Sequence, residues 1–322
     1  MPTVRVSPGR RLVGAAVAVA AGVVLLPHLP WVDPWGLVPI AQALVPLLCT
    51  VLLLAAAVLL LLRRWWAALA LLLGAALAAL PLLLPPLSEH PDDAQEKGLT
   101  VLSLNVQVSS AQPSQVAAQI SETGAAVVVL LEVREDYVQE VLRSQPFGAD
   151  VEVHRVGEAS GGVVGSVILS SHTLADQGQV PRPAGVVTQH QPTAVLTHPD
   201  LGPVRVAAVH PMPPHAAPQD WAAMLDRIGA WQRGQEGLPL VLTGDFNAST
   251  AHPRLRRLSQ GLVSASPRAW ILPRPSWPVG GPVPAFTGID HVLVRDLRVL
   301  RSDRFTVNGT DHAGVVAYLA QK

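Results

Sequence analysis

Three long apolar stretches in the first 87 residues limit what this chain can fold into more than any other feature. They cover residues 12–29, 37–62 and 67–84, and none of them contains a charged side chain. Each approaches or exceeds the roughly 18–20 residues with which a helix crosses the hydrocarbon core of a bilayer. Arg10 and Arg11 before the first stretch would also suit a signal peptide. Because two further stretches follow at once, we expect a retained anchor of three transmembrane helices.

Arginines beside these stretches predict their orientation. Arg5, Arg10 and Arg11 precede the first stretch, and Arg63 and Arg64 separate the second from the third. The positive-inside rule places both groups on the cytoplasmic side. Tryptophans, which favour the headgroup level, stand at the expected helix ends: Trp31, Trp35, Trp65 and Trp66. Three crossings would put the rest of this multi-pass chain outside the cytoplasmic membrane.

The composition after residue 87 differs from that of the anchor. This part holds 18 basic and 22 acidic residues, a formal charge of −4. A dedicated duplex-DNA binder usually carries a basic surface, so this charge disfavours a nuclease. The single cysteine, Cys49, lies in the second apolar stretch, and no intramolecular disulfide can form. We expect Cys49 to be a packed or lipid-facing side chain.

Residues 99–322 are expected to form an α/β domain that follows a linker at 88–98. Apolar and β-branched runs of strand length predict β-strands at residues 99–106, 126–132, 163–170, 193–198, 204–210, 238–243, 286–294 and 315–319. Helices are predicted at residues 113–123, 135–144 and 219–233, and a long loop rich in Pro, Gly and Trp at 268–284. Two layers of β-sheet covered by helices would accommodate this order.

The sharpest chemical motif is Gly244-Asp245-Phe246-Asn247, directly after a predicted strand. A carboxylate and an amide two residues apart can both face one reacting centre at the mouth of a strand. An ordinary Asx turn that ends the strand explains the same residues equally well.

Other predicted strands also end in chemically capable side chains. Asn105, Glu132 and His210 each end such a run, and converging strand ends are where sheets place active sites. A carboxylate at the tip of a buried strand needs a partner or a cation. Glu132 is therefore expected either to ligate a metal or to pair with Arg134 or another arginine. A single histidine after a strand, such as His210, is more often structural than catalytic.

Two Asp-His pairs stand near the C-terminus. Asp290-His291 begins one predicted strand, and Asp311-His312 precedes the last one. A carboxylate beside an imidazole suits the orientation of the ring and raises its basicity. Solvated loops contain such pairs by chance about as often, so neither pair decides a function alone.

The order of these elements is more specific than any one of them. Asn-x-Gln, Glu, His, Gly-Asp-Phe-Asn, Asp-His and a final Asp-His follow one another, each at a strand end. This order resembles the endonuclease/exonuclease/phosphatase superfamily, which includes DNase I-like nucleases, inositol polyphosphate phosphatases and sphingomyelinases. The resemblance covers residues 99–319. It implies a four-layer α/β sandwich and a Mg²⁺-dependent attack of water on phosphorus, with Mn²⁺ as an alternative metal.

The resemblance also implies a set of metal ligands. By position, Glu132 resembles the principal ligand, Asn105 lies nearby, and Asp311 resembles a second carboxylate at the metal. Gln107 departs from the pattern, because DNA-repair members carry an aspartate there that helps to hold metal. This departure weakens the nuclease interpretation and leaves the number of metal ions open.

Five further residues resemble the family's catalytic groups. His312 resembles the general base or the phosphate-contacting histidine, paired with Asp290. Asp245 resembles the residue that orients or deprotonates the attacking water. Asn247 and His210 resemble contacts to phosphate oxygens, where donors stabilise the developing negative charge.

Three spans before an external domain of this family resemble actinobacterial membrane proteins linked to teicoplanin resistance, of the VanJ type. This resemblance implies hydrolysis of a phosphate or pyrophosphate on a polyprenyl carrier or another lipid of the cell envelope. A short tether would keep the site close to such substrates. In the predicted loop, Trp270, Trp277 and Pro278 are expected to dip toward lipid, to line a groove, or simply to pack.

Other functions compete with this hypothesis. An anchored extracellular nuclease would line its nucleic-acid groove with basic side chains, and Arg254, Arg256 and Arg257 are the only dense basic cluster after the anchor. A phospholipase C-like phosphodiesterase fits the same motifs, whereas a non-catalytic membrane scaffold leaves the complete motif set unexplained. The expected partners are thus the bilayer and a phosphorylated lipid, and no protein partner is inferred.

Overall fold

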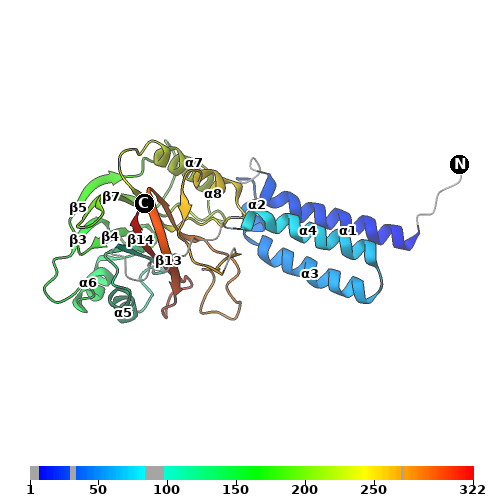
Figure 1. Ribbon diagram of the computed structural model, residues 1–322, viewed down its shortest axis with the longest axis horizontal. Helices are drawn as coiled ribbons and strands as arrows, with labels where there is room; N and C mark the ends of the chain where they lie inside the picture. Colours follow the sequence, from blue (N-terminus) through cyan, green and yellow to red (C-terminus); the bar gives the residue numbers. More distant parts are fainter. Residues whose placement is uncertain (1–6, 30–33, 84–97, 270–271) are drawn as a thin grey trace.

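The computed structural model describes residues 7–29, 34–83, 98–269 and 272–322, so most of the predicted linker and Trp270 lie outside the described residues. The chain has two parts, a rod of helices and an α/β domain (Figure 1). In the rod, α1 (Pro8–Leu25) and α3 (Val45–Leu61) both pack against α4 (Trp65–Ala79). The short helix α2 (Val38–Ala43) lies where the rod meets the α/β domain.

Two helices of the described chain are long and apolar enough to cross a membrane, where the sequence predicts three. They are Pro8–His28 and Trp65–Leu82, each ending in a 3₁₀ turn. The predicted middle span, 37–62, is instead divided into α2 and α3. Pro46, near the start of α3, has no N–H to continue the hydrogen-bond ladder of α2. The 17 residues of α3 alone stand at the lower limit of the length that spans a bilayer.

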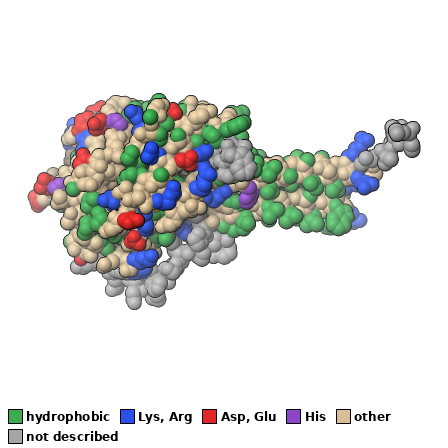
Figure 2. Space-filling view, turned by 90° about the horizontal axis from the view of Figure 1, so that it is seen from above, with side chains coloured by type: hydrophobic (Ala, Val, Ile, Leu, Met, Phe, Trp, Pro, Cys, Tyr) green, Lys and Arg blue, Asp and Glu red, His purple; other side chains and the backbone are tan. Residues whose placement is uncertain are grey.

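Apolar side chains cover the outside of the rod. Figure 2 shows them along its whole length, whereas charged side chains gather on the α/β domain and at the far end of the rod. Val19, Leu54, Leu61 and Leu73 are each more than half exposed. An exposed apolar surface of this kind marks a contact with a membrane or with another protein.

Small residues let the helices of the rod approach closely. A Cβ atom at Gly74 of α4 would overlap the side chain of Ala20 in α1, as expected where helices pack in lipid. The Sγ atom of Cys49 in α3 lies 3.6 Å from the carbonyl oxygen of Ala75 in α4. Cys49 is therefore packed between two helices.

The α/β domain contains two six-stranded sheets. The first has the order β13-β14-β1-β2-β4-β3 and comprises β1 (Leu99–Asn105), β2 (Val127–Leu131), β3 (His154–Glu158), β4 (Ser166–Ser170), β13 (Leu297–Phe305) and β14 (Gly314–Gln321). The second has the order β5-β6-β7-β8-β12-β9 and comprises β5 (Leu174–Gln179), β6 (Pro192–His198), β7 (Gly202–Val209), β8 (Leu240–Asp245), β9 (Val263–Ser264) and β12 (Asp290–Arg295). Both sheets are mixed, because β1 and β2 pair in parallel, as do β7 and β8, and the other strands pair antiparallel.

Helices flank the two packed sheets. Valines of both sheets, among them Val101, Val129, Val206 and Val241, are fully buried in the core between the sheets. The outer face of the first sheet is covered by α5 (Pro113–Thr123) and α6 (Glu135–Arg143). That of the second is covered by α7 (Pro218–Arg233) and α8 (Pro253–Leu258). The two mixed sheets flanked by helices confirm the predicted α/β architecture.

The sequence-based prediction missed the weakly patterned strands. It did not include β3, β5 and β13, and it placed the start of β12 four residues too early, at residue 286. Five of the six residues of β5 are exposed, so this edge strand lacks the alternation that predicts a strand. The predicted loop at 268–284 also contains two short strands, β10 (Arg268–Ala269) and β11 (Leu272–Pro273).

Candidate active site

Strand pairing brings the predicted site residues to one end of the two sheets. Because β1 and β2 are parallel neighbours, Asn105 at the end of β1 and Glu132 after β2 lie at the same end of the first sheet. The parallel pair β7 and β8 places His210 and Asp245 together in the second sheet in the same way.

Two antiparallel strands begin where these strands end. Asp290 opens β12 and is the direct cross-strand partner of Asp245. His312 precedes β14, which pairs antiparallel with β1, so its imidazole returns to the end of β1 that carries Asn105. Residues from six separate chain segments therefore meet at one place.

Asn105 links the two sheets. Its side-chain N–H groups donate to Oε1 of Glu132 at 3.0 Å and to Oδ2 of Asp245 at 3.2 Å. Its own Oδ1 accepts from the backbone N–H of Gln107 at 2.9 Å. One fully buried amide thus fixes two carboxylates that belong to different sheets.

The backbone aims Glu132 into this cluster. Its φ of 57° is in the left-handed region, which is uncommon for a residue with a side chain. Oε2 accepts from the N–H of Val108 at 3.1 Å. Arg134 pairs with Asp136 instead of Glu132, so the predicted alternative of a Glu132–Arg134 ion pair is wrong.

His312 lies between carboxylates. Its Nδ1 is 3.1 Å from Oδ2 of Asp290, and its Nε2 is 3.8 Å from both Oδ2 of Asp245 and Oδ1 of Asp311. Burial alone would lower the pKa of His312, but Asp290, Asp245 and Asp311 raise this pKa to about 10. The imidazole is therefore protonated at neutral pH, and Asp290 orients His312 and not its sequence neighbour His291.

The carboxyl group of Asp245 is fully buried. Burial raises its pKa to about 7, against the opposing effect of protonated His312. The group therefore changes charge near neutral pH, which suits a residue that exchanges a proton with water.

Asn247 and His210 each contact one carboxylate of the cluster. The backbone N–H of Asn247 donates to Oδ1 of Asp245 at 2.8 Å, which forms the expected Asx turn, and its amide donates to the carbonyl oxygen of Pro211 at 3.1 Å. Burial lowers the pKa of His210 to about 3, so its ring is neutral. Its Nε2 lies 3.7 Å from Oε1 of Glu132, and its buried Nδ1 has no hydrogen-bond partner in the described structure.

Asp311 is held by two residues of other segments. The backbone N–H of Asp311 donates to the side-chain oxygen of Gln107 at 2.9 Å. The indole N–H of Trp277 donates to Oδ2 of Asp311 at 2.9 Å. Trp277 therefore helps to form the site, which is one of the roles that the sequence leaves open for it.

Two glycines permit this geometry. A Cβ atom at Gly244 would overlap the backbone of Val209, and one at Gly309 would overlap the carbonyl oxygen of Ser110. Both glycines also have a positive φ, 143° and 90°. The glycines before Asp245 and Thr310 are therefore required by close backbone approach and not only by turn preference.

A cavity of about 640 Å³ opens at this cluster. The carboxylates of Glu132, Asp245 and Asp311 line it together with His210 and His312, and its described lining contains no lysine or arginine. Asn105 and Asp290 lie behind these groups. An anionic substrate in this cavity would meet more negative than positive charge, so the donor set fits a divalent cation, which prefers oxygen ligands.

The side chains of Asp245, Asp290 and His312 also place possible ligand atoms within 4.8 Å of one another. The structure thus contains a buried group that is able to hold a metal ion. Asp290 points both of its oxygens at Nδ1 of His312, and an ion pair already explains that arrangement. Glu132 and Asp311 place further carboxylate oxygens in the same cavity.

Several residues of the cavity carry no signal in the sequence. Gln189 lies in an irregular segment, and Thr287 pairs with Trp277 in an isolated β-bridge. Each of the two buries a side-chain oxygen that has no hydrogen-bond partner among the described residues. Pro39, Ile40 and Ala43 of α2 also line the cavity, although they belong to a predicted membrane span.

Comparison with known proteins identifies the family. The profile of the Endonuclease/Exonuclease/phosphatase family matches residues 102–312, well over half of the chain. The chain belongs to this family. It is therefore an enzyme that hydrolyses phosphoric esters, and its site residues lie inside the matched region. A search of curated proteins finds no match.

Solved structures share the fold of this family member. A functionally unknown conserved protein from Enterococcus faecalis V583 has 15% identity and a TM-score of 0.55, over 70% of this chain and 100% of its own. An endonuclease/exonuclease/phosphatase from Beutenbergia cavernae has 20% identity and a TM-score of 0.52, over 70% and 72%. The 3' phosphatase NExo from Neisseria, bound to a product DNA hairpin, has 17% identity and a TM-score of 0.51, over 68% and 98%.

Proposed function

We propose that this enzyme hydrolyses a phosphoester or pyrophosphate bond of a lipid-linked, polyprenyl-type phosphate outside the cytoplasmic membrane, with Mg²⁺. One observation carries the proposal: a single cavity is lined both by Glu132, Asp245 and His312 and by Ile40 of the helical rod. The cavity therefore combines residues suited to phosphate hydrolysis with an apolar wall on the membrane side. An amphiphilic phosphate needs both kinds of contact.

Two carboxylates of the proposed metal set supply oxygen ligands. Glu132 and Asp311 would hold the cation, which when bound offsets the negative charge of the phosphate. The Oδ1 atom of Asn105 already accepts from the N–H of Gln107. Asn105 already orients Glu132 through a hydrogen bond of 3.0 Å, and Trp277 orients Asp311. Such supporting contacts tune metal sites.

Proton transfer is assigned to Asp245. Its pKa near 7 lets it accept the proton of the attacking water at neutral pH. Protonated His312 faces the same space and supplies a positive charge, or a proton to the leaving oxygen, while Asp290 holds the ring. His312 is thus better suited to contact the phosphate than to act as the general base. His210 and Asn247 complete the contacts to phosphate oxygens.

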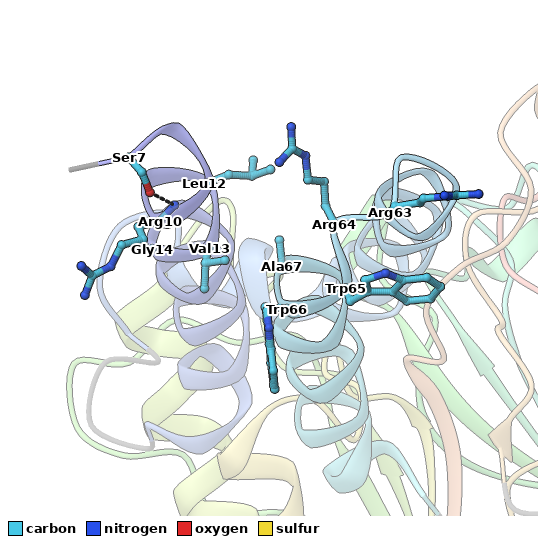
Figure 3. A pocket seen from close by; sticks show the side chains of 11 residues that line it. Ser7, Arg10, Leu12, Val13, Gly14, Arg63, Arg64, Trp65, Trp66 and Ala67 are labelled. Carbon is cyan, nitrogen blue, oxygen red and sulfur yellow. Dashed lines mark hydrogen bonds between the residues drawn. The ribbon is translucent and has the colours of Figure 1, made fainter. Parts of the chain in front are cut away.

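Arginines at the far end of the rod support the proposed orientation. Arg10 of α1 and Arg63 and Arg64 before α4 surround one end of the helices, and Trp65 and Trp66 lie beside them (Figure 3). The positive-inside rule makes this the cytoplasmic end. With α3 counted as a third, short span, the catalytic domain lies outside, as in the VanJ-type arrangement. Digestion of the domain by protease added to intact spheroplasts tests this orientation.

The predicted basic cluster does not support the nuclease alternative. Arg254 and Arg257 pair with Asp226 of α7. Arg256 donates to the carbonyl oxygens of Thr250 and of Pro27 in the rod. These guanidinium groups bind the protein itself, and they are not among the residues that line the cavity.

A substrate panel tests the proposal. The full chain in lipid nanodiscs, with Mg²⁺ or with a chelator, is offered a polyprenyl pyrophosphate, a phosphatidyl lipid and plasmid DNA. The proposal expects metal-dependent phosphate release from the polyprenyl substrate at the highest kcat/KM. Faster nicking of the plasmid would support the nuclease, and faster cleavage of the phosphatidyl lipid would support the phospholipase C-like alternative.

A further inference from the structure

The cavity at the catalytic cluster has a polar side and an apolar side. The polar side consists of the carboxylates and histidines described above. The apolar side is formed by Ile40 and Ala43 of α2 and by Met212, Pro213 and Pro214 after β7. These five apolar side chains are half-buried, neither in the core nor fully in solvent. The cavity is continuous, so one molecule can contact both sides.

Hydrogen bonds hold α2 in place as a wall. Nε2 of the fully buried His252, at the start of α8, lies 2.9 Å from the carbonyl oxygen of Pro39. Because a carbonyl only accepts, His252 donates here, and its Nδ1 accepts from the backbone N–H of Ser249 at 2.9 Å. In the same helix, the buried side chain of Gln42 donates to the carbonyl oxygen of Leu26 at 2.9 Å.

The wall therefore belongs to both parts of the chain. His252 ties α2 to the α/β domain, and Gln42 ties it to the end of α1. Ala251, beside His252, packs into the core of the helical rod. A catalytic domain without the rod would keep the carboxylates and histidines but would lose Ile40 and Ala43. Its cavity would then be open on the apolar side.

We propose that Ile40, Ala43 and Met212 form a subsite for the first carbons of the alkyl or isoprenyl chain attached to the phosphate. This inference rests on the proposed function, since it assumes that the substrate is an amphiphilic phosphate. It adds that the protein recognises the chain directly. Tethering to the bilayer alone would raise the local concentration of any lipid, whereas a subsite discriminates chain lengths even among soluble molecules.

The expected signature is a dependence of binding on chain length. Each buried methylene group strengthens binding about fourfold. Methyl, butyl and hexyl phosphonates are soluble, resist hydrolysis and share one headgroup. For the full chain in nanodiscs with Mg²⁺, we expect the Kd measured by calorimetry to fall steeply from methyl to hexyl phosphonate, after subtraction of the signal from empty nanodiscs.

Substitutions test the named residues. Ile40→Ala should weaken binding of hexyl phosphonate roughly tenfold and leave methyl phosphonate unchanged, and Ile40→Leu should restore the preference. Met212→Ala, in the segment after β7, should have the same selective effect, which guards against a local disturbance of α2. Leu37→Ala is the matched control, because Leu37 precedes α2, is 76% exposed and does not line the cavity.

The outcomes separate this inference from the proposed function. Equal Kd values for methyl and hexyl phosphonate, or an equal loss of both in Ile40→Ala and Met212→Ala, would overturn the subsite. Hydrolysis of the polyprenyl substrate in the same nanodiscs is measured independently. If that lipid is hydrolysed but the Kd of the phosphonates does not depend on chain length, the result supports the proposed function and refutes the subsite.

Discussion

Asp290 and His312 form a contact between the two sheets of the domain. Asp290 opens β12 of the second sheet, and His312 precedes β14 of the first, yet Nδ1 of His312 lies 3.1 Å from Oδ2 of Asp290. The contact directs Nε2 toward Asp245 and Asp311 at the cavity. Sheet packing and catalytic geometry are thus coupled, because a shift of one sheet against the other would separate the pair.

Asp290→Asn should keep the shape of this contact but remove its charge. Among the charges that raise the pKa of His312, that of Asp290 has the largest effect. Without it, this pKa should fall from about 10, and the alkaline limit of activity should move to lower pH. We expect kcat to drop about 10²-fold or more. The pH–rate profile measures both effects. Asp303→Asn, on the exposed side of β13, should change neither.

Glu132→Gln should weaken metal binding. The substitution keeps the size of the side chain and removes the negative charge that the proposed cation requires. Mn²⁺ affinity measured by electron paramagnetic resonance should fall at least about tenfold. Glu122→Gln, on the surface of α5, provides the control. Unchanged Mn²⁺ affinity in Glu132→Gln would exclude this residue as a principal ligand.

Gly244→Ala should destabilise the domain through a backbone clash. The new Cβ would overlap Val209 in the neighbouring strand, in addition to the strain of a positive φ. We expect a loss of at least about 2 kcal/mol in the free energy of unfolding, seen as a lower thermal midpoint. Gly202→Ala separates the two causes, since Gly202 has a φ of 68° with open space around it, and it should cost only about 1 kcal/mol.

His252 should make the junction between rod and domain sensitive to acid. Burial lowers its pKa from 6.5 to about 4, so the unfolded state binds a proton that the folded state does not. Its stabilising effect is complete above pH 6.5 and is lost as the pH falls toward 4, with a slope approaching about 1.4 kcal/mol per pH unit. The thermal midpoint of wild type should therefore drop more between pH 7 and pH 4.5 than that of His252→Gln. The control His154→Gln should behave like wild type, and an equal drop in His252→Gln would refute the assignment.

Local sequence patterns predict the central elements of the fold well. Strands β1, β2, β6, β7, β8 and β14 are buried and rich in Val and Leu, and α5 begins and ends where the sequence indicates. Edge strands such as β5 expose most of their side chains. Their pairing comes from the neighbouring strand and not from their own pattern, so local sequence cannot identify them.

The candidate site could be predicted because its residues stand at strand ends. Asn105 and Asp245 end buried strands and Glu132 follows one, and parallel pairing brings such ends together. The contribution of Ile40 could not be predicted, because it depends on how α2 sits against the α/β domain. The continuous apolar pattern of residues 37–62 also gave no sign that the helix breaks near Pro46, which makes α2 a separate helix.

Metal-dependent phosphate release from a polyprenyl pyrophosphate, in nanodiscs that hold the full chain, tests the central claim most directly. With Mg²⁺, wild-type protein should release phosphate, and both a chelator and the substitution Asp245→Asn should reduce the rate at least about 10²-fold. Release that continues at the wild-type rate in Asp245→Asn, or no release while plasmid DNA is nicked, would contradict the account.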